Sequence, residues 1–237
     1  MLIREDVIKA AEDYKYLLNR GYNQKSALDF VTSRYMLTPT ERALLLRCVH
    51  RDDEAHAIRR KLVENIEGKK LIIDGYNTLL TLVSVFEGRY VYLCDDCIVR
   101  DLRSSYIKDF SSPLIIKAIN ELASFIKMLR PEHVVVILDK NVSWSARHAE
   151  VIRSIVPEFE VRLAKKADIE VIVSLGIISS SDFVILSRAK YVFDVAGKII
   201  ASKFRDRIVR FDKIVCKESC SPYWGYAISN IRPLTKL

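Results

Sequence analysis

The chain has 237 residues and no low-complexity segment, which is enough for one large domain or two small ones. Half of it is hydrophobic and 29% is charged, a balance that permits a packed core and excludes disordered or fibrous proteins. The net charge of +8 suits a polyanionic partner, and charges at residues 4–6 replace the apolar run of a signal peptide, so we expect a cytoplasmic protein without a membrane partner.

Residues 1–67 predict a small all-helical N-terminal domain. A first apolar stripe stops near Gly21, and a second helix centres on residues 27–31. Residues 38–41 read Thr-Pro-Thr-Glu, which is typical of a helix start because the threonine and glutamate can cap the first turn. A fourth helix is expected over residues 52–65, since it begins with three acidic residues.

Residues 68–237 change to short β-branched runs that alternate with helical stretches. This pattern predicts an α/β domain with a parallel sheet flanked by helices. The expected strands are 70–74, 133–139, 159–163 and 177–181, and the expected helices are 113–130, 145–156 and 167–176. Residues 183–186 fit either a strand or a helix, and residues 88–112 predict an inserted loop or hairpin over the site.

Four aspartates follow the expected strands or begin the next helix: Asp74, Asp139, Asp168 and Asp182. Because the carboxyl ends of parallel strands meet at one edge of a sheet, these carboxylates should converge there. Their charges would repel one another unless a divalent cation held them, and oxygen ligands suit Mg²⁺ or Mn²⁺. The four therefore predict a metal site with catalytic carboxylates, although each could also serve a turn or a helix cap.

Other residues near these aspartates are candidate ligands of substrate or metal. Asn77 could hold a phosphate or a water, and Lys165 and Lys166 suit a phosphate backbone. Asp95 and Asp96 lie in the expected loop and could be further metal ligands, or a solvated acidic loop.

The C-terminal segment carries most of the net positive charge, with nine basic and three acidic residues in 198–237. Arg205, Arg207 and Arg210 alternate with apolar residues, which predicts a packed element with a basic outer face for RNA phosphates. The alternative is a solvated basic tail.

The chain has five cysteines, an odd number that suits a reducing compartment. Four of them could form a zinc site, although buried thiols fit them better: Cys94, Cys97, Cys216 and Cys220. Whether these four meet is left open by the sequence.

Residues 71–77, which end in Asp-Gly-Tyr-Asn, resemble the first strand of the PIN-like superfamily in its NYN and YacP-like branch. Residues 135–139, 166–170 and 180–183 are similar to its later acidic motifs, and the resemblance covers about residues 69–197. It implies a PIN-like fold and ribonuclease activity. The whole chain also resembles a family of uncharacterised archaeal proteins that join a helical domain to such a domain.

The leading hypothesis is a ribonuclease that hydrolyses phosphodiesters with an acidic Mg²⁺ or Mn²⁺ cluster. The alternative is a catalytically inactive nucleic-acid-binding module of PIN-like fold. A phosphohydrolase of the aspartyl-phosphate type is disfavoured, because Tyr76 occupies the place of its second aspartate. The sequence does not indicate an oligomeric state.

Overall fold

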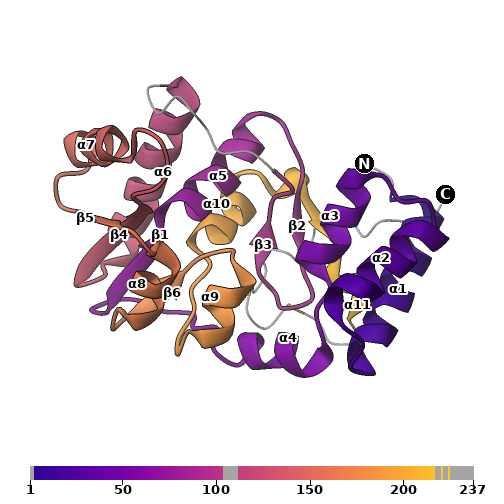
Figure 1. The fold of residues 1–237 in the computed structure, drawn as a ribbon. Helices are drawn as coiled ribbons and strands as arrows, with labels where there is room; N and C mark the ends of the chain where they lie inside the picture. The colour runs from indigo at the N-terminus through magenta and orange to yellow at the C-terminus, as the bar shows by residue number, and fades with distance from the viewer. Residues whose placement is uncertain (1–2, 104–111, 217–219, 221–223, 225–237) are drawn as a thin grey trace.

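The computed structural model describes residues 3–103, 112–216, 220 and 224 (Figure 1). Its N-terminal region is helical, as the sequence predicts, and contains α1 (Glu5–Asn19), α2 (Gln24–Arg34), α3 (Pro39–Cys48) and α4 (Asp52–Arg59). The expected capping box of α3 is confirmed, since the amide of Glu41 donates to Thr38 and the Glu41 carboxylate accepts from the Thr38 amide.

The fourth helix ends at Arg59, six residues earlier than expected. The reason is a backbone pairing with a distant segment. The amide of Val63 donates to the carbonyl of Val192, and the amide of Val192 donates to the carbonyl of Lys61. The helix gives way to a turn at residues 60–61, and the bridge of Leu62 with Val192 then supplies partners for the backbone groups beyond the helix end.

Four parallel strands form the main sheet in the order β5-β4-β1-β6. They are β1 (Lys70–Asp74), β4 (His133–Asp139), β5 (Glu160–Ala164) and β6 (Ile177–Ser179). The sheet has two buried faces, which explains why the central strands read as continuous apolar runs. Leu71 and Ile73 of β1 pack into one core, and Ile72 packs into the core on the opposite face.

Helices cover both faces of this sheet (Figure 1). They are α5 (Gly75–Phe86), α6 (Pro113–Leu129), α7 (Ser145–Ile155) and α10 (Val195–Lys203) on one face, with α8 (Ala167–Val173) and α9 (Phe183–Arg188) on the other. The ambiguous residues 183–186 are therefore helical. Gly75 begins α5 where a Cβ would lie 2.5 Å from the Leu138 side chain and 2.9 Å from that of Val136, so a larger residue would require these β4 side chains or α5 to shift.

A second, three-stranded sheet in the order β3-β2-β7 joins the two halves of the molecule. Its strands are β2 (Val91–Leu93), β3 (Val99–Arg100) and β7 (Ile208–Arg210), and β7 is preceded by η1 (Arg205–Arg207) and followed by α11 (Asp212–Val215). The sequence predicted a loop or a hairpin in residues 88–112, and β2 and β3 form a hairpin there, whereas strand β7 was not predicted. Tyr92 and Val209 pack in one core with α1, α2 and α3, so the N-terminal helices rest on this sheet. Independent folding of the two parts stays a prediction.

The cysteines do not form the zinc site that the sequence left open. Cys97 and Cys220 are joined by a disulfide, so two of the four proposed thiols are oxidised. Cys94 instead contacts Cys48, with 2.8 Å between their sulfur atoms, and Cys216 lies against Arg59. The expectation of buried thiols is thus correct for Cys94, wrong for the disulfide pair, and only partly met by Cys216, which is a half-buried free thiol.

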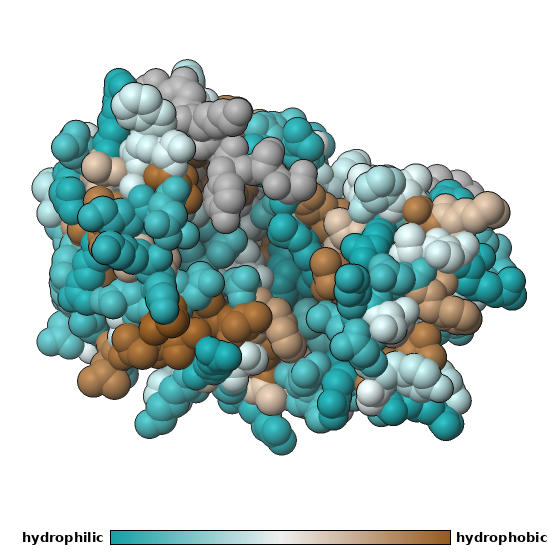
Figure 2. Space-filling view, viewed as in Figure 1, coloured by the Kyte–Doolittle hydropathy of each residue, from teal (hydrophilic) through white to brown (hydrophobic). Residues whose placement is uncertain are grey.

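Among the described residues, no helix is both long enough and apolar enough to cross a bilayer. The surface does carry an apolar patch over α8 and α9, visible as a brown band in Figure 2. Ile169, Val173, Leu175 and Val184 are its exposed apolar residues in that part of the chain.

Candidate acidic site at the edge of the sheet

The four predicted aspartates lie at the carboxyl edge of the main sheet. Asp74 is the last residue of β1, and Asp139 is the last residue of β4. Asp168 lies in the first turn of α8, which follows β5, and Asp182 is the N-cap of α9, which follows β6. We call this group the acidic edge. It ranges from buried Asp74, through half-buried Asp139 and Asp182, to exposed Asp168.

Asp74 is the buried centre of the acidic edge. Its Oδ2 accepts hydrogen bonds from Nδ2 of Asn77 and Oγ of Ser180, each 2.6 Å long. Its Oδ1 accepts no hydrogen bond from the described residues. Burial raises the pKa of Asp74 to about 6, the hydrogen bonds from Asn77 and Ser180 oppose this, and the charges of Asp182 and Asp168 add to it.

The acidic edge is electrostatically coupled. The pKa of Asp168 is raised by partial burial and then by the charges of Asp182 and Asp139. Together with the shift of Asp74, this links all four carboxylates into one group of like charges. In the described part of the chain, no lysine, arginine or histidine forms an ion pair with any of them. The charge of the acidic edge is therefore left without a protein counter-ion there.

The spacing of the acidic edge is looser than that of a closed metal cage. Among the described residues, three ligand atoms come within 4.8 Å of one another only for His50, Asp95 and Asp96. Mg²⁺, however, keeps several waters and is usually bound by one or two carboxylates plus substrate phosphates. The acidic edge therefore fits an open, water-rich ion better than an ion enclosed by protein.

Asp95 and Asp96 are fully buried, so they are not the solvated loop that the sequence allowed. Asp95 binds Lys15 at 2.8 Å and Nδ1 of His50 at 2.7 Å, and Asp96 binds both terminal nitrogens of Arg100. We call these five residues the buried ion-pair network. Burial acts to raise the pKa of Asp95, but His50 and Lys15 outweigh it and lower that pKa. Lys15 and Arg100 therefore already pair with the carboxylates that a metal would need.

The predicted substrate residues near the four aspartates lie in two places. Asn77 lies at the acidic edge, where it holds Asp74. Lys165 and Lys166 are exposed in the turn before α8, close in sequence to Asp168, as a backbone-binding role requires.

The basic C-terminal face is smaller than the sequence predicts. Arg210 is buried and paired with Asp212 at 2.6 Å, so it does not lie on an outer face. Arg205 and Arg207 are half-buried, and Arg207 donates to the carbonyl of Gly88. The reason is that β7 inserts beside β2, which buries one side of this segment. The basic residues of 225–237 lie outside the described residues.

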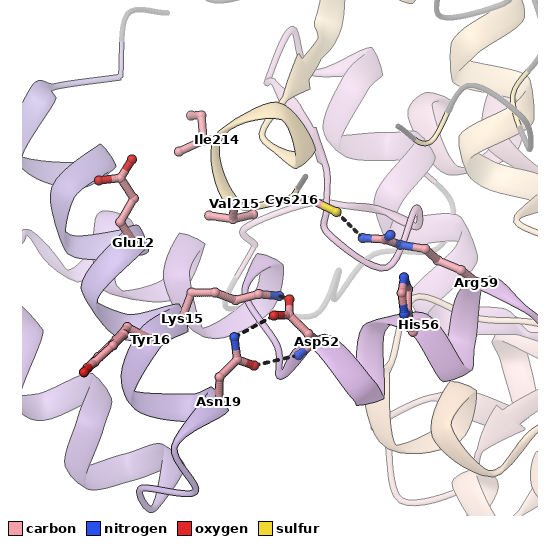
Figure 3. Close-up of a pocket in the computed structure, with 10 residues that line it drawn as sticks. All are labelled: Glu12, Lys15, Tyr16, Asn19, Asp52, His56, Arg59, Ile214, Val215 and Cys216. Carbon is pink, nitrogen blue, oxygen red and sulfur yellow. Dashed lines mark hydrogen bonds and ion pairs between the residues drawn. The ribbon is translucent and has the colours of Figure 1, made fainter. Parts of the chain in front are cut away.

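A cavity of about 550 Å³ lies away from the acidic edge, between α1, α4 and α11 (Figure 3). Its polar walls are already paired, since Asp52 binds both Lys15 and Asn19, and Arg59 contacts Cys216. None of the four aspartates lines it. The cavity therefore does not change the assignment of the candidate site.

Sequence reasoning missed Ser180 as a residue of the site. It lies after β6, and its hydroxyl reaches Asp74 across 106 residues of sequence. The run of serines at 179–181 was visible, but nothing in it indicated which hydroxyl would meet the buried carboxylate.

Fold and site together define an α/β protein with a parallel sheet, an acidic carboxyl edge and an N-terminal helical region. Residues 63–198 match the family model described as domain of unknown function DUF5616, and residues 6–61 match the one described as protein of unknown function DUF434. The chain belongs to the DUF5616 family, whose model covers more than half of it.

One relative is the uncharacterized protein MJ0935 of Methanocaldococcus jannaschii. It is 36% identical over 200 residues, which cover 81% of this chain and 95% of the relative. An archaeal protein of similar length thus shares most of the chain. No solved structure matches this chain.

Proposed function

We propose that the protein is a metal-dependent ribonuclease whose α/β domain is PIN-like. The observation that carries the proposal is the acidic edge, four coupled carboxylates without a basic partner among the described residues. Groups whose pKa values are shifted by burial and by neighbouring charges are enriched at functional sites. The resemblance of residues 71–77 and 180–183 to the NYN and YacP-like branch supports the same class of reaction.

The donor set fits Mg²⁺ or Mn²⁺. All four side chains offer oxygen, and Oδ1 of Asp74 has no hydrogen bond from the described residues that a metal would have to displace. Asp74, Asp139, Asp168 and Asp182 would hold the ion. When bound, such an ion supplies a more acidic water and neutralises charge on a phosphodiester.

The surrounding side chains then have defined tasks. Asn77 and Ser180 fix the orientation of the Asp74 carboxylate through their two hydrogen bonds. Lys165 and Lys166 are exposed and attract the RNA backbone without reading its sequence.

The second candidate is an inactive RNA-binding module of the same fold. It is favoured by one observation, the absence of three acidic-edge oxygens within 4.8 Å among the described residues. The two candidates differ in outcome: the module would bind RNA in the presence of metal and leave it intact.

Cleavage of 5′-labelled single-stranded RNA with Mn²⁺ tests the proposal. We expect the wild type to cleave and Asp74→Asn to lose activity by about 100-fold or more, because the replacement removes a charged ligand. Asp206→Asn is the matched control, since Asp206 is an exposed aspartate of η1 outside the acidic edge. Equal cleavage by wild type and Asp74→Asn, or none by either with Mn²⁺ or Mg²⁺, would overturn the ribonuclease.

A further inference from the structure

A cleft of about 200 Å³ lies directly beside the acidic edge. One wall comes from the N-terminal helical region and the other from the α/β region, and the residues that matter are Leu46, Arg47, His50, Asn77, Ser181 and Asp182. Asn77 and Asp182 belong to the candidate site itself, so a molecule that reaches the acidic edge also meets the helical wall.

The helical wall contributes a positive charge that the protein does not neutralise. Arg47 donates to the carbonyls of Asp101 and Arg103 at 3.0 Å each, and no carboxylate of the described residues pairs with it. Arg100 also lines the cleft, but Asp96 already balances its charge. Arg47 is thus the cationic group that remains for a ligand.

The helical wall is held in a fixed position relative to the acidic edge. The ring of His50 stacks on Phe183 with 4.1 Å between centroids and 5° between planes. Phe183 follows Asp182 directly, and His50 is itself held by Asp95. Arg47 is therefore presented at a set distance from Asp182 rather than on a free arm, as a substrate-positioning group requires.

We propose that the N-terminal helical region supplies a phosphate subsite, centred on Arg47, for single-stranded RNA bound at the acidic edge. The inference rests on the proposed ribonuclease function and names the part of the substrate that the helical region contacts. A guanidinium recognises the planar pair of oxygens of a phosphodiester, and it offsets the repulsion that RNA meets at four carboxylates.

Adding charge to the cleft wall tests the subsite without breaking a hydrogen bond. Leu46 lines the cleft and is 39% exposed, so Leu46→Glu places a carboxylate beside Arg47, and Leu46→Gln is its neutral comparator. Phe30→Glu adds the same charge to an exposed position of α2 outside the cleft. Binding of a fluorescein-labelled 10-nucleotide RNA is measured by anisotropy with Ca²⁺, and cleavage is measured with Mn²⁺.

We expect Leu46→Glu to bind the RNA about tenfold more weakly than Leu46→Gln and to raise KM more than it lowers kcat. Phe30→Glu should bind like the wild type. Arg47→Gln should weaken binding and reduce its salt slope by about one phosphate contact.

The outcomes separate the two proposals. Equal RNA affinity of Leu46→Glu and Leu46→Gln, in a wild type that cleaves, would overturn the subsite and leave the ribonuclease standing. Binding without cleavage, weakened by Leu46→Glu, would support the subsite and overturn the ribonuclease. A wild type that neither binds nor cleaves RNA would overturn both.

Discussion

The protein contains two groups of aspartates that differ in their partners: one group is paired with cations, and the other is not. In the buried ion-pair network, Asp95 and Asp96 are fully buried and every carboxylate has a cation within 2.8 Å. At the acidic edge, Asp74 is nearly as buried, but its partners are an amide and a hydroxyl, and its nearest charges are other aspartates. The network supports the structure, whereas the acidic edge stays costly to ionise until something positive binds.

Removing one partner from the buried ion-pair network should have the largest effect. Asp96→Ala leaves the guanidinium of Arg100 buried without a counter-ion, and we expect the free energy of unfolding to fall by about 3–5 kcal/mol. Urea denaturation measures this. The double variant Asp96→Leu with Arg100→Met should recover most of the loss, and a loss under about 1 kcal/mol in Asp96→Ala would show that the network is not structural.

Neutralising Asp74 of the acidic edge should instead raise the free energy of unfolding. The pKa of Asp74 is about 6 in the folded protein against 3.8 for the ordinary carboxyl. The folded state therefore binds the proton more tightly, and its stability falls as pH rises from about 4 to above 6. Asp74→Asn lacks this penalty, so without metal we expect it to be more stable than wild type by up to about 3 kcal/mol at pH 8.

The gain of Asp74→Asn should vanish near pH 4, where Asp74 is protonated in the wild-type fold as well. Denaturation series at pH 4, 6 and 8 in EDTA measure this dependence. A variant that is less stable than wild type at pH 8 would mean that the charged carboxylate is well accommodated and that the comparison between the two groups fails.

Metal binding at the acidic edge should stabilise the fold by a slightly smaller amount than the change expected for Asp74→Asn. An ion that binds only the folded state at 100 times its Kd stabilises that state by about 2.7 kcal/mol. We expect Mn²⁺ to raise the Tm of the wild type, and to raise it much less in Asp74→Asn. Asp206→Asn should respond like the wild type, because its carboxylate lies on η1. The same rise in Tm for Asp74→Asn would place the ion elsewhere.

Local rules predicted much of this fold and of its acidic edge. Residues 38–41 specify a helix start through contacts within one turn, and the structure has that helix. The apolar runs before Asp74 and Asp139 are enough to predict where β1 and β4 end. The positions of these two aspartates were therefore predicted correctly. Such features depend on neighbours in sequence.

Features that depend on distant partners were missed. The three-residue strand β7 exists because Ile208–Arg210 pairs with β2, and the burial of Arg210 follows from that pairing. The partner of Cys97 lies 123 residues away, and the hydroxyl of Ser180 reaches Asp74 only after the sheet has formed. No spacing rule in the sequence specifies such meetings.

The disulfide between Cys97 and Cys220 also makes the oxidised chain a ring with two arms. Three aspartates of the acidic edge, Asp139, Asp168 and Asp182, lie on the ring, whereas Asp74 lies on the N-terminal arm. A single peptide-bond cut anywhere between the two cysteines therefore leaves one covalent molecule, whereas a cut between Asp74 and Cys97 breaks the covalent link between Asp74 and the ring. The disulfide thus determines which backbone cuts leave all four aspartates of the acidic edge in one covalent molecule.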